Sequence, residues 1–352
     1  MRLQRLRASM QRLGADASLI TTKENVAYYS GFTGTSSQLL ITKEHKLFFT
    51  DFRYAEQAEA ETDYTVVETK GQERIDTLFD HAKKLGVKKL GIDLSGVSYM
   101  AYKAYQKKIS ENDIIDISQD VSAQRAVKDV NELALIEKGA KHNDALFAHL
   151  RGLLRPGISE NDIKAEIIYF MHKNGAESAF PPIVASGENS SLPHATPSDR
   201  ILRPGDLLTL DYGCRFNGYC SDFTRTVAIS YMDKERQKVY DIVKCAGERA
   251  LLALMPGVHA HRVDAAAREY IAQHGFGEAF GHGVGHGVGL FIHEAPVMNA
   301  LSKAILEEGM VITIEPGIYM TGRFGVRTED LCVIKQSGCV NLTASPRDAI
   351  II

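Results

Sequence analysis

The sequence has no apolar run long enough to cross a membrane. Nothing in its 352 residues approaches the roughly 18 consecutive apolar residues that a transmembrane helix needs. The first ten residues, MRLQRLRASM, are basic, but the apolar stretch of about 7 to 15 residues typical of a secretory signal does not follow them. These absences predict a soluble, cytoplasmic protein with no membrane partner.

An excess of charge of one sign is also missing. The chain has 41 Lys and Arg against 44 Asp and Glu, a net charge of -3. Because nucleic-acid-binding proteins usually present a basic surface, we expect no nucleic-acid partner and favour a small one.

Several chemical motifs are absent. There is no G-x-S-x-G nucleophile elbow and no P-loop, and GFGEAFG at 275–281 is one residue too long for a G-x-G-x-x-G motif. The five cysteines form no C-x-x-C pair, so neither a disulfide framework nor a zinc knuckle is indicated, and we expect buried, reduced thiols. They are Cys214, Cys220, Cys245, Cys332 and Cys339.

The length predicts about two domains at roughly 150 residues per domain, and 44% hydrophobic residues exclude disorder. In the first domain, 1–122, β-rich runs alternate with helical patterns, which predicts a compact α/β domain. The expected strands are 17–22, 38–42, 46–50, 64–69, 89–93 and 113–117, and the expected helices are 2–13, 52–62, 73–85 and 98–109.

The second domain, 125–352, contains an internal repeat. Residues 154–180 align with 254–280 at an offset of 100, and 204–213 align with 308–317 at an offset of 104. A solenoid would need three or more repeats, so two copies of a helix-helix-strand module about a pseudo-two-fold axis are predicted, giving an α+β domain. The alternative is that Pro-Gly is ordinary punctuation before a helix.

Helix signals frame the first copy. Asp129 and Glu132 form a capping box that opens a helix running to Leu154, and a second helix runs from Ser159 to Gly175.

Carboxylates follow equivalent strands in both copies, Asp211 after DLLTL and Glu315 after MVITI. Asn217-Gly218 predicts a two-residue hairpin loop that places Asp222 diagonally opposite Asp211, at roughly 7 to 8 Å between Cα atoms. Such carboxylates repel unless cations lie between them, and the spacing suits a pair of metal ions. The alternative for each is a solvated surface acid.

Two further groups extend this set. Glu329 follows a turn broken by glycines in the second copy. In GHGVGHGVG, glycines alternate with His282 and His286, which predicts an extended segment whose imidazoles lie about 13 Å apart. One histidine is therefore expected to bind metal while the other shapes the pocket; otherwise both are ordinary histidines.

These residues resemble the pita-bread metallopeptidase family, which includes Xaa-Pro aminopeptidase, prolidase, methionine aminopeptidase and the metal-free creatinase. The resemblance covers about 125–352, and the first domain is similar to the N-terminal domain of aminopeptidase P, prolidase and creatinase. The matching segments are LDYG, SDFTRT, GHGVGLFIHEAP, TIEPGIY and VRTED.

The resemblance implies the role of each matching residue. Asp211 would hold one divalent ion, His286 and Glu315 the other, and Asp222 and Glu329 both. The implied substrate and catalytic residues are His194, His293 and Glu315, and the implied pocket residues are His282, Tyr319 and Arg327. Because the ligands are rich in oxygen, manganese or cobalt is expected, with zinc as the alternative.

The implied activity is removal of the N-terminal residue from peptides with proline in second position. Archaeal-type prolidases resemble HEYPR, whose Arg is thought to meet the carboxylate of a dipeptide, whereas this chain reads HEAPV with Val297. We therefore favour an Xaa-Pro aminopeptidase over a prolidase, although another cation could replace the Arg. A creatinase-like hydrolase and a non-catalytic peptide-binding module are further alternatives.

The resembling enzymes also imply a homodimer. The aromatic candidates for an exposed contact between subunits are Tyr28, Tyr29 and Phe32, for which core packing is the alternative.

Overall fold

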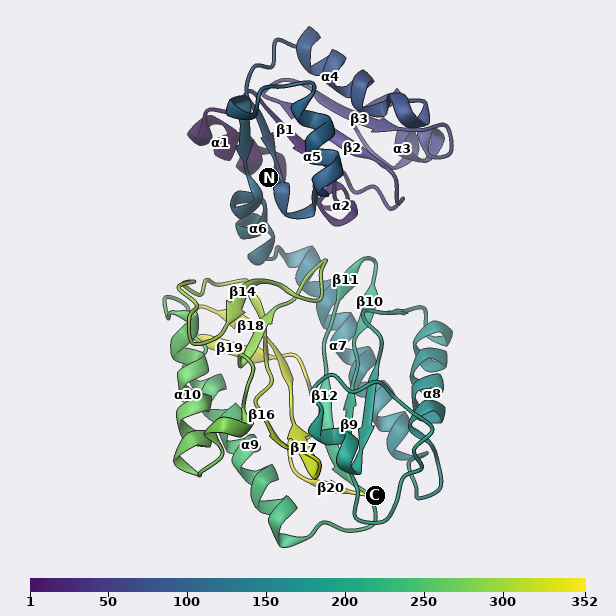
Figure 1. Cartoon of the computed structure of the whole chain (residues 1–352), viewed down its shortest axis with the longest axis vertical. Coiled ribbons are helices and arrows are strands. Elements are labelled where there is room, and N and C mark those ends of the chain that lie inside the picture. The colour runs from purple at the N-terminus through teal and green to yellow at the C-terminus, as the bar shows by residue number, and fades with distance from the viewer. The chain divides into compact units, whose positions relative to one another are not determined.

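The computed structural model describes residues 1–352, apart from the side chain of Gln72. The chain divides into two compact units, Met1–Gln124 and Arg125–Ile352, and the predicted division lay between 122 and 125 (Figure 1). No helix of the described residues combines the length and the apolarity of a membrane span.

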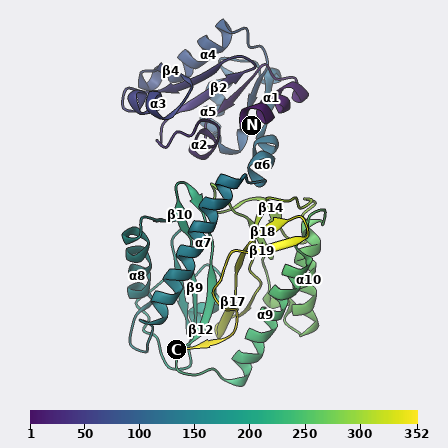
Figure 2. The same ribbon diagram turned by 180° about the vertical axis from the view of Figure 1, so that it is seen from behind.

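The first unit is a six-stranded sheet with helices packed beside it, in the order β4-β3-β2-β1-β5-β6 (Figures 1 and 2). Every strand predicted there is confirmed. The strands are β1 (Ala17–Ile20), β2 (Gln38–Thr42), β3 (Lys46–Thr50), β4 (Thr65–Glu68), β5 (Leu90–Ile92) and β6 (Ile114–Asp116). Strands β1, β5 and β6 run parallel, and β1, β2 and β3 run antiparallel.

The predicted helices of this unit are confirmed, and two others were not predicted. The α-helices are α1 (Arg2–Leu13), α2 (Lys23–Ser30), α3 (Ala55–Glu61), α4 (Arg74–Lys84), α5 (Tyr99–Gln106) and α6 (Ser118–Ala126), with short 3₁₀ helices η1 (Gly71–Glu73), η2 (Leu94–Gly96) and η3 (Glu111–Asp113). The missed helix α2 has eight residues and no side-chain cap, so packing rather than a local signal stabilises it.

The expectation of an exposed aromatic contact was wrong. Tyr28, Tyr29 and Phe32 are 3%, 6% and 1% exposed, and the Tyr28 and Tyr29 rings pack edge to face at 5.0 Å. Burying their apolar rings stabilises the fold, so the core-packing alternative holds. The homodimer itself stays a prediction.

The second unit packs long helices against short, mostly antiparallel sheets (Figure 2). Its helices are α7 (Val130–Arg151), α8 (Glu160–Lys173), α9 (Lys234–Ala253) and α10 (Ala260–Gln273), with 3₁₀ helices η4 (Gly187–Ser191) and η5 (Gly277–Ala279). The strands of its first half are β7 (Glu177–Ser178), β8 (Ile183–Ser186), β9 (Leu207–Asp211), β10 (Cys214–Phe216), β11 (Tyr219–Cys220) and β12 (Thr224–Ala228).

The remaining strands belong to the second half. They are β13 (Gly285–Gly287), β14 (Glu294–Met298), β15 (Val311–Ile314), β16 (Gly317–Met320), β17 (Phe324–Arg327), β18 (Asp330–Lys335), β19 (Gly338–Asn341) and β20 (Ile350–Ile351). Strand β20 returns to pair with β12, so the end of the chain closes the sheet of the first half.

The predicted repeat is confirmed by matching elements. Helices α8 and α10 coincide at the offset of 100, and β9 and β15 begin at positions 104 apart. Even the isolated β-bridges correspond: Ser159 pairs with Ile201, and His259 pairs with Ile305. The two copies therefore present equivalent strand ends toward one region.

The local helix and cysteine predictions can also be compared with the structure. The capping box of Asp129 and Glu132 is present at the start of α7, and the side chain of Ser159 caps α8. All five cysteines are free; three are buried, and Cys245 and Cys339 are partly exposed.

Candidate functional site

The hairpin predicted from Asn217-Gly218 brings the first carboxylates together. Both loop residues have positive φ, 46° and 85°, as a two-residue hairpin turn requires. Phe216 pairs with Tyr219, and the same register pairs Asp211 with Thr224. Asp222 therefore lies diagonally across from Asp211, on the same face of the ribbon, as predicted.

The second copy supplies its carboxylates beside these. Ile314 pairs with Asp330 at the end of the antiparallel ladder between β15 and β18. Continuing this register by one residue places Glu315 opposite Glu329. The backbone of Glu329 bridges to Thr224, whose Oγ1 donates a hydrogen bond of 2.7 Å to Glu329 Oε2. The acids of the two copies thus meet across this bridge.

His286 on β13 completes the group. Its Nε2 lies 3.6 Å from Asp222 Oδ2 and 3.3 Å from Glu315 Oε1, while its Nδ1 lies 3.1 Å from the carbonyl oxygen of Gly287. A carbonyl only accepts hydrogen bonds, so Nδ1 carries the proton and a neutral ring turns a lone pair toward the carboxylates. Burial lowers the pKa of His286 and so favours this neutral ring.

The electrostatics of this cluster call for a cation. Ligand atoms of Asp222, His286 and Glu329 lie within 4.8 Å of one another. Burial, followed by the charges of Glu315 and Asp211, raises the pKa of Glu329 well above its ordinary value. Burial, followed by the charge of Glu329, raises the pKa of Asp222 in the same way. Acceptors facing acceptors in a buried site fit a metal ion, so the residues present suit one.

A hydrogen-bonded chain borders the cluster. Arg327 pairs with Asp211 and donates to Tyr319 Oη at 2.8 Å, and Tyr319 Oη lies 2.9 Å from His282 Nε2. Because Arg327 can only donate, the tyrosine hydroxyl donates onward to His282. His282 Nδ1 lies 2.8 Å from the carbonyl of Gly283, so the orientations of all these side chains are fixed.

Two histidines stand at the open side of the cavity. The ring of His293 packs edge-on to that of His286, with centroids 4.3 Å apart. Burial and the nearby His286 lower the pKa of His293. His194 is exposed and lies on the loop that follows η4.

All of the predicted site residues line one cavity of about 600 Å³, within the range typical of ligand pockets. These residues are His194, Asp211, Asp222, His282, His286, His293, Glu315, Tyr319, Arg327 and Glu329. Val297 lines the same cavity and is 55% exposed. The cavity also has apolar walls, which include Phe180, Pro181 and Pro182.

Sequence reasoning missed two residues that matter here. Lys164 on α8 lines the cavity, and Thr313 Oγ1 donates to Glu315 Oε1 at 3.3 Å. Thr313 could have been found, because it lies two residues before Glu315 on the same face of its strand. Lys164 carried no signal, since a lysine within a helix is usually solvated.

Comparisons with known proteins agree with this geometry. Residues 134–336 match Metallopeptidase family M24, and residues 2–127 match the Creatinase/Prolidase N-terminal domain. The structure of an Xaa-Pro dipeptidase from Bacillus anthracis is 39% identical with a TM-score of 0.96, and the match covers 100% of this chain and 99% of that one.

Of two further relatives, one is named an aminopeptidase and the other a dipeptidase. An X-Pro aminopeptidase structure from Thermotoga maritima is 38% identical with a TM-score of 0.90, over 98% of this chain and 100% of that one. An Xaa-Pro dipeptidase of Pyrococcus furiosus is 34% identical over 99% of each chain.

Proposed function

Because the chain belongs to metallopeptidase family M24 and is of the Xaa-Pro dipeptidase or aminopeptidase type, we propose that it removes the N-terminal residue from peptides whose second residue is proline. The observation that carries this proposal is the convergence of acids and histidines from both copies on one cavity. The preference proposed here is for Xaa-Pro-Yaa peptides over dipeptides.

The cluster is proposed to hold two divalent ions, manganese or cobalt, with zinc as the alternative. The residues that would hold them are Asp211, Asp222, His286, Glu315 and Glu329, which offer carboxylate oxygens and one imidazole nitrogen. When bound, such ions lower the pKa of water toward neutrality and stabilise the negative charge that develops at the scissile carbonyl.

The side chains around the cluster perform the remaining tasks. His293, held edge-on to His286, is proposed to donate a hydrogen bond to the scissile carbonyl oxygen, and His194 to bind the peptide from the opposite loop. Glu315 is proposed to carry a proton to the proline nitrogen as it leaves. Burial raises the pKa of Glu315, which favours the protonated form that can give up a proton.

The chain of Arg327, Tyr319 and His282 is proposed to hold the substrate in register. Each of these side chains is buried or partly buried and hydrogen-bonded to the next, so they form a rigid wall. The apolar residues Phe180, Pro181 and Pro182 offer the surface that a proline ring needs, because a pyrrolidine has no polar atom besides its nitrogen.

Val297 supports the aminopeptidase preference. It lines the cavity at the position where the resemblance to archaeal-type prolidases implies an arginine, and a valine cannot bind a terminal carboxylate. A longer peptide, whose proline carries an amide instead of a carboxylate, should then be accepted.

One observation favours the second candidate, a dipeptidase. Lys164 lines the same cavity and has no ion-pair partner among the described side chains. The other lysine or arginine that lines it, Arg327, is committed to Asp211 and Tyr319. Lys164 is therefore the cation available to a substrate carboxylate.

The test is a paired assay with manganese supplied. Release of the N-terminal residue is compared for an Xaa-Pro dipeptide and an Xaa-Pro-Yaa tripeptide, each before and after chelation. Preference for the tripeptide, lost on chelation, supports the proposal, whereas activity confined to the dipeptide makes the chain a dipeptidase. Chelation-resistant activity would instead favour a creatinase-like hydrolase, and no activity a peptide-binding module.

A further inference from the structure

The side chain of His194 does not hold its own loop in place. The ring of His194 is exposed and makes no hydrogen bond or ion pair with the described residues. Its neighbours also line the cavity, so the whole turn faces the substrate site; they are Pro193, Ala195, Thr196 and Pro197. The residues on either side of this turn must therefore hold it in place.

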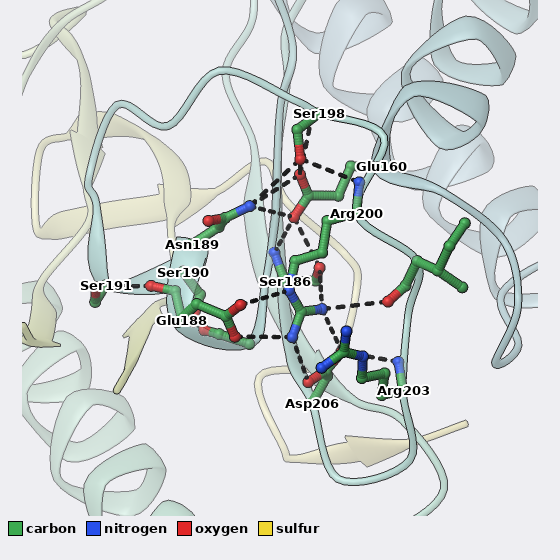
Figure 3. Close-up of polar contacts among 12 residues, drawn as sticks. Glu160, Ser186, Glu188, Asn189, Ser190, Ser191, Ser198, Arg200, Arg203 and Asp206 are labelled. Carbon is green, nitrogen blue, oxygen red and sulfur yellow. Dashed lines mark hydrogen bonds and ion pairs between the residues drawn. The ribbon is translucent and has the colours of Figure 1, made fainter. Parts of the chain in front are cut away.

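Glu160, the first residue of α8, contacts both sides of that turn (Figure 3). It is 0% exposed, and its Oε1 accepts hydrogen bonds of 2.7 Å from both the backbone nitrogen and Oγ of Ser186. Its Oε2 accepts from the backbone nitrogen and Oγ of Ser198, at 3.0 and 2.7 Å. Asn189 Nδ2 spans both oxygens, at 3.1 and 3.2 Å. One buried carboxylate thus ties the segments before and after His194 to the same helix.

Arg200 contacts the same segment as Glu160 through Ser186 (Figure 3). It donates to Ser186 Oγ at 2.8 Å, and it forms ion pairs with Asp206 at 2.6 Å and Glu188 at 2.9 Å. These contacts use the charge of Arg200, so the charge of Glu160 is balanced by hydrogen-bond donors. Charge-assisted bonds of this kind are stronger and more directional than neutral ones.

The loop also contacts the wall that holds Arg327. Ser190 Oγ accepts from the backbone nitrogen of Gly325 at 2.9 Å. A Cβ at Gly325 would lie 2.0 Å from the carbonyl oxygen of Ser190, so only glycine permits this close packing of η4 on β17. The same loop therefore connects α8 with the strand that ends at Arg327.

We propose that Glu160 is a positioning residue for catalysis, acting through Ser186 and Ser198 to hold His194 over the cavity. This inference rests on the proposed function, because it requires that His194 contacts the peptide. Glutamine at this position would turn an NH₂ group toward N–H and O–H donors, and would lose the charge that strengthens the other bonds.

The experiment uses the full chain in a double-mutant cycle of Glu160→Gln and His194→Ala, with kcat/KM measured on an Xaa-Pro-Yaa peptide with manganese. We expect Glu160→Gln alone to lower kcat/KM about tenfold, and less than about threefold when His194 is already alanine, because coupled residues are not additive. Asp162→Asn is the matched control. The Asp162 carboxylate lies on the same helical turn as Glu160 and contacts Ser159, but it does not contact the loop that carries His194. This variant should leave kcat/KM unchanged.

Hydrogen exchange provides a second readout that needs neither metal nor turnover. The amides of Ser186 and Ser198 are bonded to Glu160, so peptides covering 186–198 should exchange faster in Glu160→Gln than in the wild type or Asp162→Asn. Should Glu160→Gln fail to fold, Ser198→Ala removes one bond to the carboxylate and should produce the same coupling with His194 at reduced size.

The outcomes separate this inference from the proposed function. Additive losses in the cycle, or unchanged exchange over 186–198, would overturn the positioning role of Glu160 while the function of His194 stands. If His194→Ala leaves kcat/KM unchanged, the role proposed for His194 fails and the inference falls with it.

Discussion

The two copies of the repeat keep the same backbone and place different side chains on it. Glu160 of the first copy corresponds to Ala260 of the second, and Lys164 corresponds to Asp264. Both copies nevertheless contain a fully buried acid on this helix, Glu160 on α8 and Asp264 on α10. The acid lies one helical turn later in the second copy.

Asp264 has a comparable set of contacts to a cavity-lining segment. Its Oδ1 accepts from the backbone nitrogen of Val284 at 3.0 Å, and it pairs with Arg268, which donates to the carbonyl of His282 at 2.6 Å. Each copy thus fixes a histidine-bearing segment through a buried carboxylate. The two copies therefore share the function of this buried acid but not its position. Because the first copy has its acid at position 160, position 164 can carry a lysine that lines the cavity.

The largest expected effect tests whether both copies are needed. Asp222→Asn and Glu329→Gln should each lower kcat/KM about a thousandfold, because each removes a proposed ligand from a different copy and bound metal supplies several kcal/mol of stabilisation. Enzyme assays and metal content after dialysis measure this, with Asp241→Asn on the exposed face of α9 as the control. Full activity in either variant would show that the substituted residue is not a required ligand.

A second prediction concerns Glu294 on β14 of the second copy, whose buried side chain pairs with two cations from the segment that precedes α7. Glu294 lies 2.7 Å from Lys128 and pairs with Arg125. Glu294→Gln should lower the free energy of unfolding at pH 7 by about 3 to 5 kcal/mol, because it leaves buried charges without a partner. Urea titration measures this, and the exposed Glu308→Gln serves as the control.

The effect of Glu294 should also depend on pH. Burial acts to raise the pKa of Glu294, but Lys128 and Arg125 outweigh it and hold that pKa below its ordinary value. The ion pairs therefore stabilise the fold above about pH 4.5, and this contribution is lost as pH falls through the pKa of the folded state. The difference in free energy of unfolding between wild type and Glu294→Gln should become smaller below pH 4.5. A larger difference there would contradict the role of Glu294 as the charged partner of Lys128 and Arg125.

The first copy has Lys164 at the position where the second copy has Asp264, and this difference leads to a prediction about substrate specificity. Lys164→Gln should lower the preference for a free-acid peptide over its C-terminal amide about tenfold, since a charged hydrogen bond contributes on the order of 1.5 kcal/mol or more. The ratio of kcat/KM for the two peptides measures this, with Lys173→Gln on the exposed end of the same helix as the control. An unchanged ratio would show that Lys164 does not bind the substrate carboxylate.

The smallest effect is expected at the hairpin that carries the acids of the first copy. Gly218 has φ 85°, and a Cβ there would meet only Leu290 at 3.5 Å, an ordinary contact. Gly218→Ala should therefore cost about 1 to 2 kcal/mol of conformational strain in thermal or urea unfolding. Gly281→Ala, which meets nothing within 4 Å and has no positive φ, should cost less.

The parts of this molecule that follow local rules could be predicted from the sequence. The alternating apolar runs gave the strands of the first unit, and Asn217-Gly218 gave the register that brings Asp211 near Asp222. The repeat placed Glu315 at the matching strand end. These features depend on side-chain periodicity and turn chemistry, which act over a few residues.

The parts that depend on packing could not be predicted. In the sequence, Glu160 resembles an ordinary acid in the first turn of a capped helix, where its charge interacts favourably with the helix dipole. Only the folded loop buries it. Lys164 reaches the cavity because α8 packs beside the loop of His194. Tyr28 and Tyr29 were candidates for a surface contact but pack in the core, and α2, which carries them, has no side-chain cap that would have revealed the helix.

The proposed peptidase site depends on acids from both copies and on the metal that they would bind. The most direct test adds manganese stepwise to chelator-treated protein while bound metal and hydrolysis of an Xaa-Pro-Yaa peptide are measured together. We expect activity to be absent without metal and to reach its plateau at two bound equivalents per chain. Full activity in the metal-free protein, or a plateau unrelated to bound metal, would contradict this dependence.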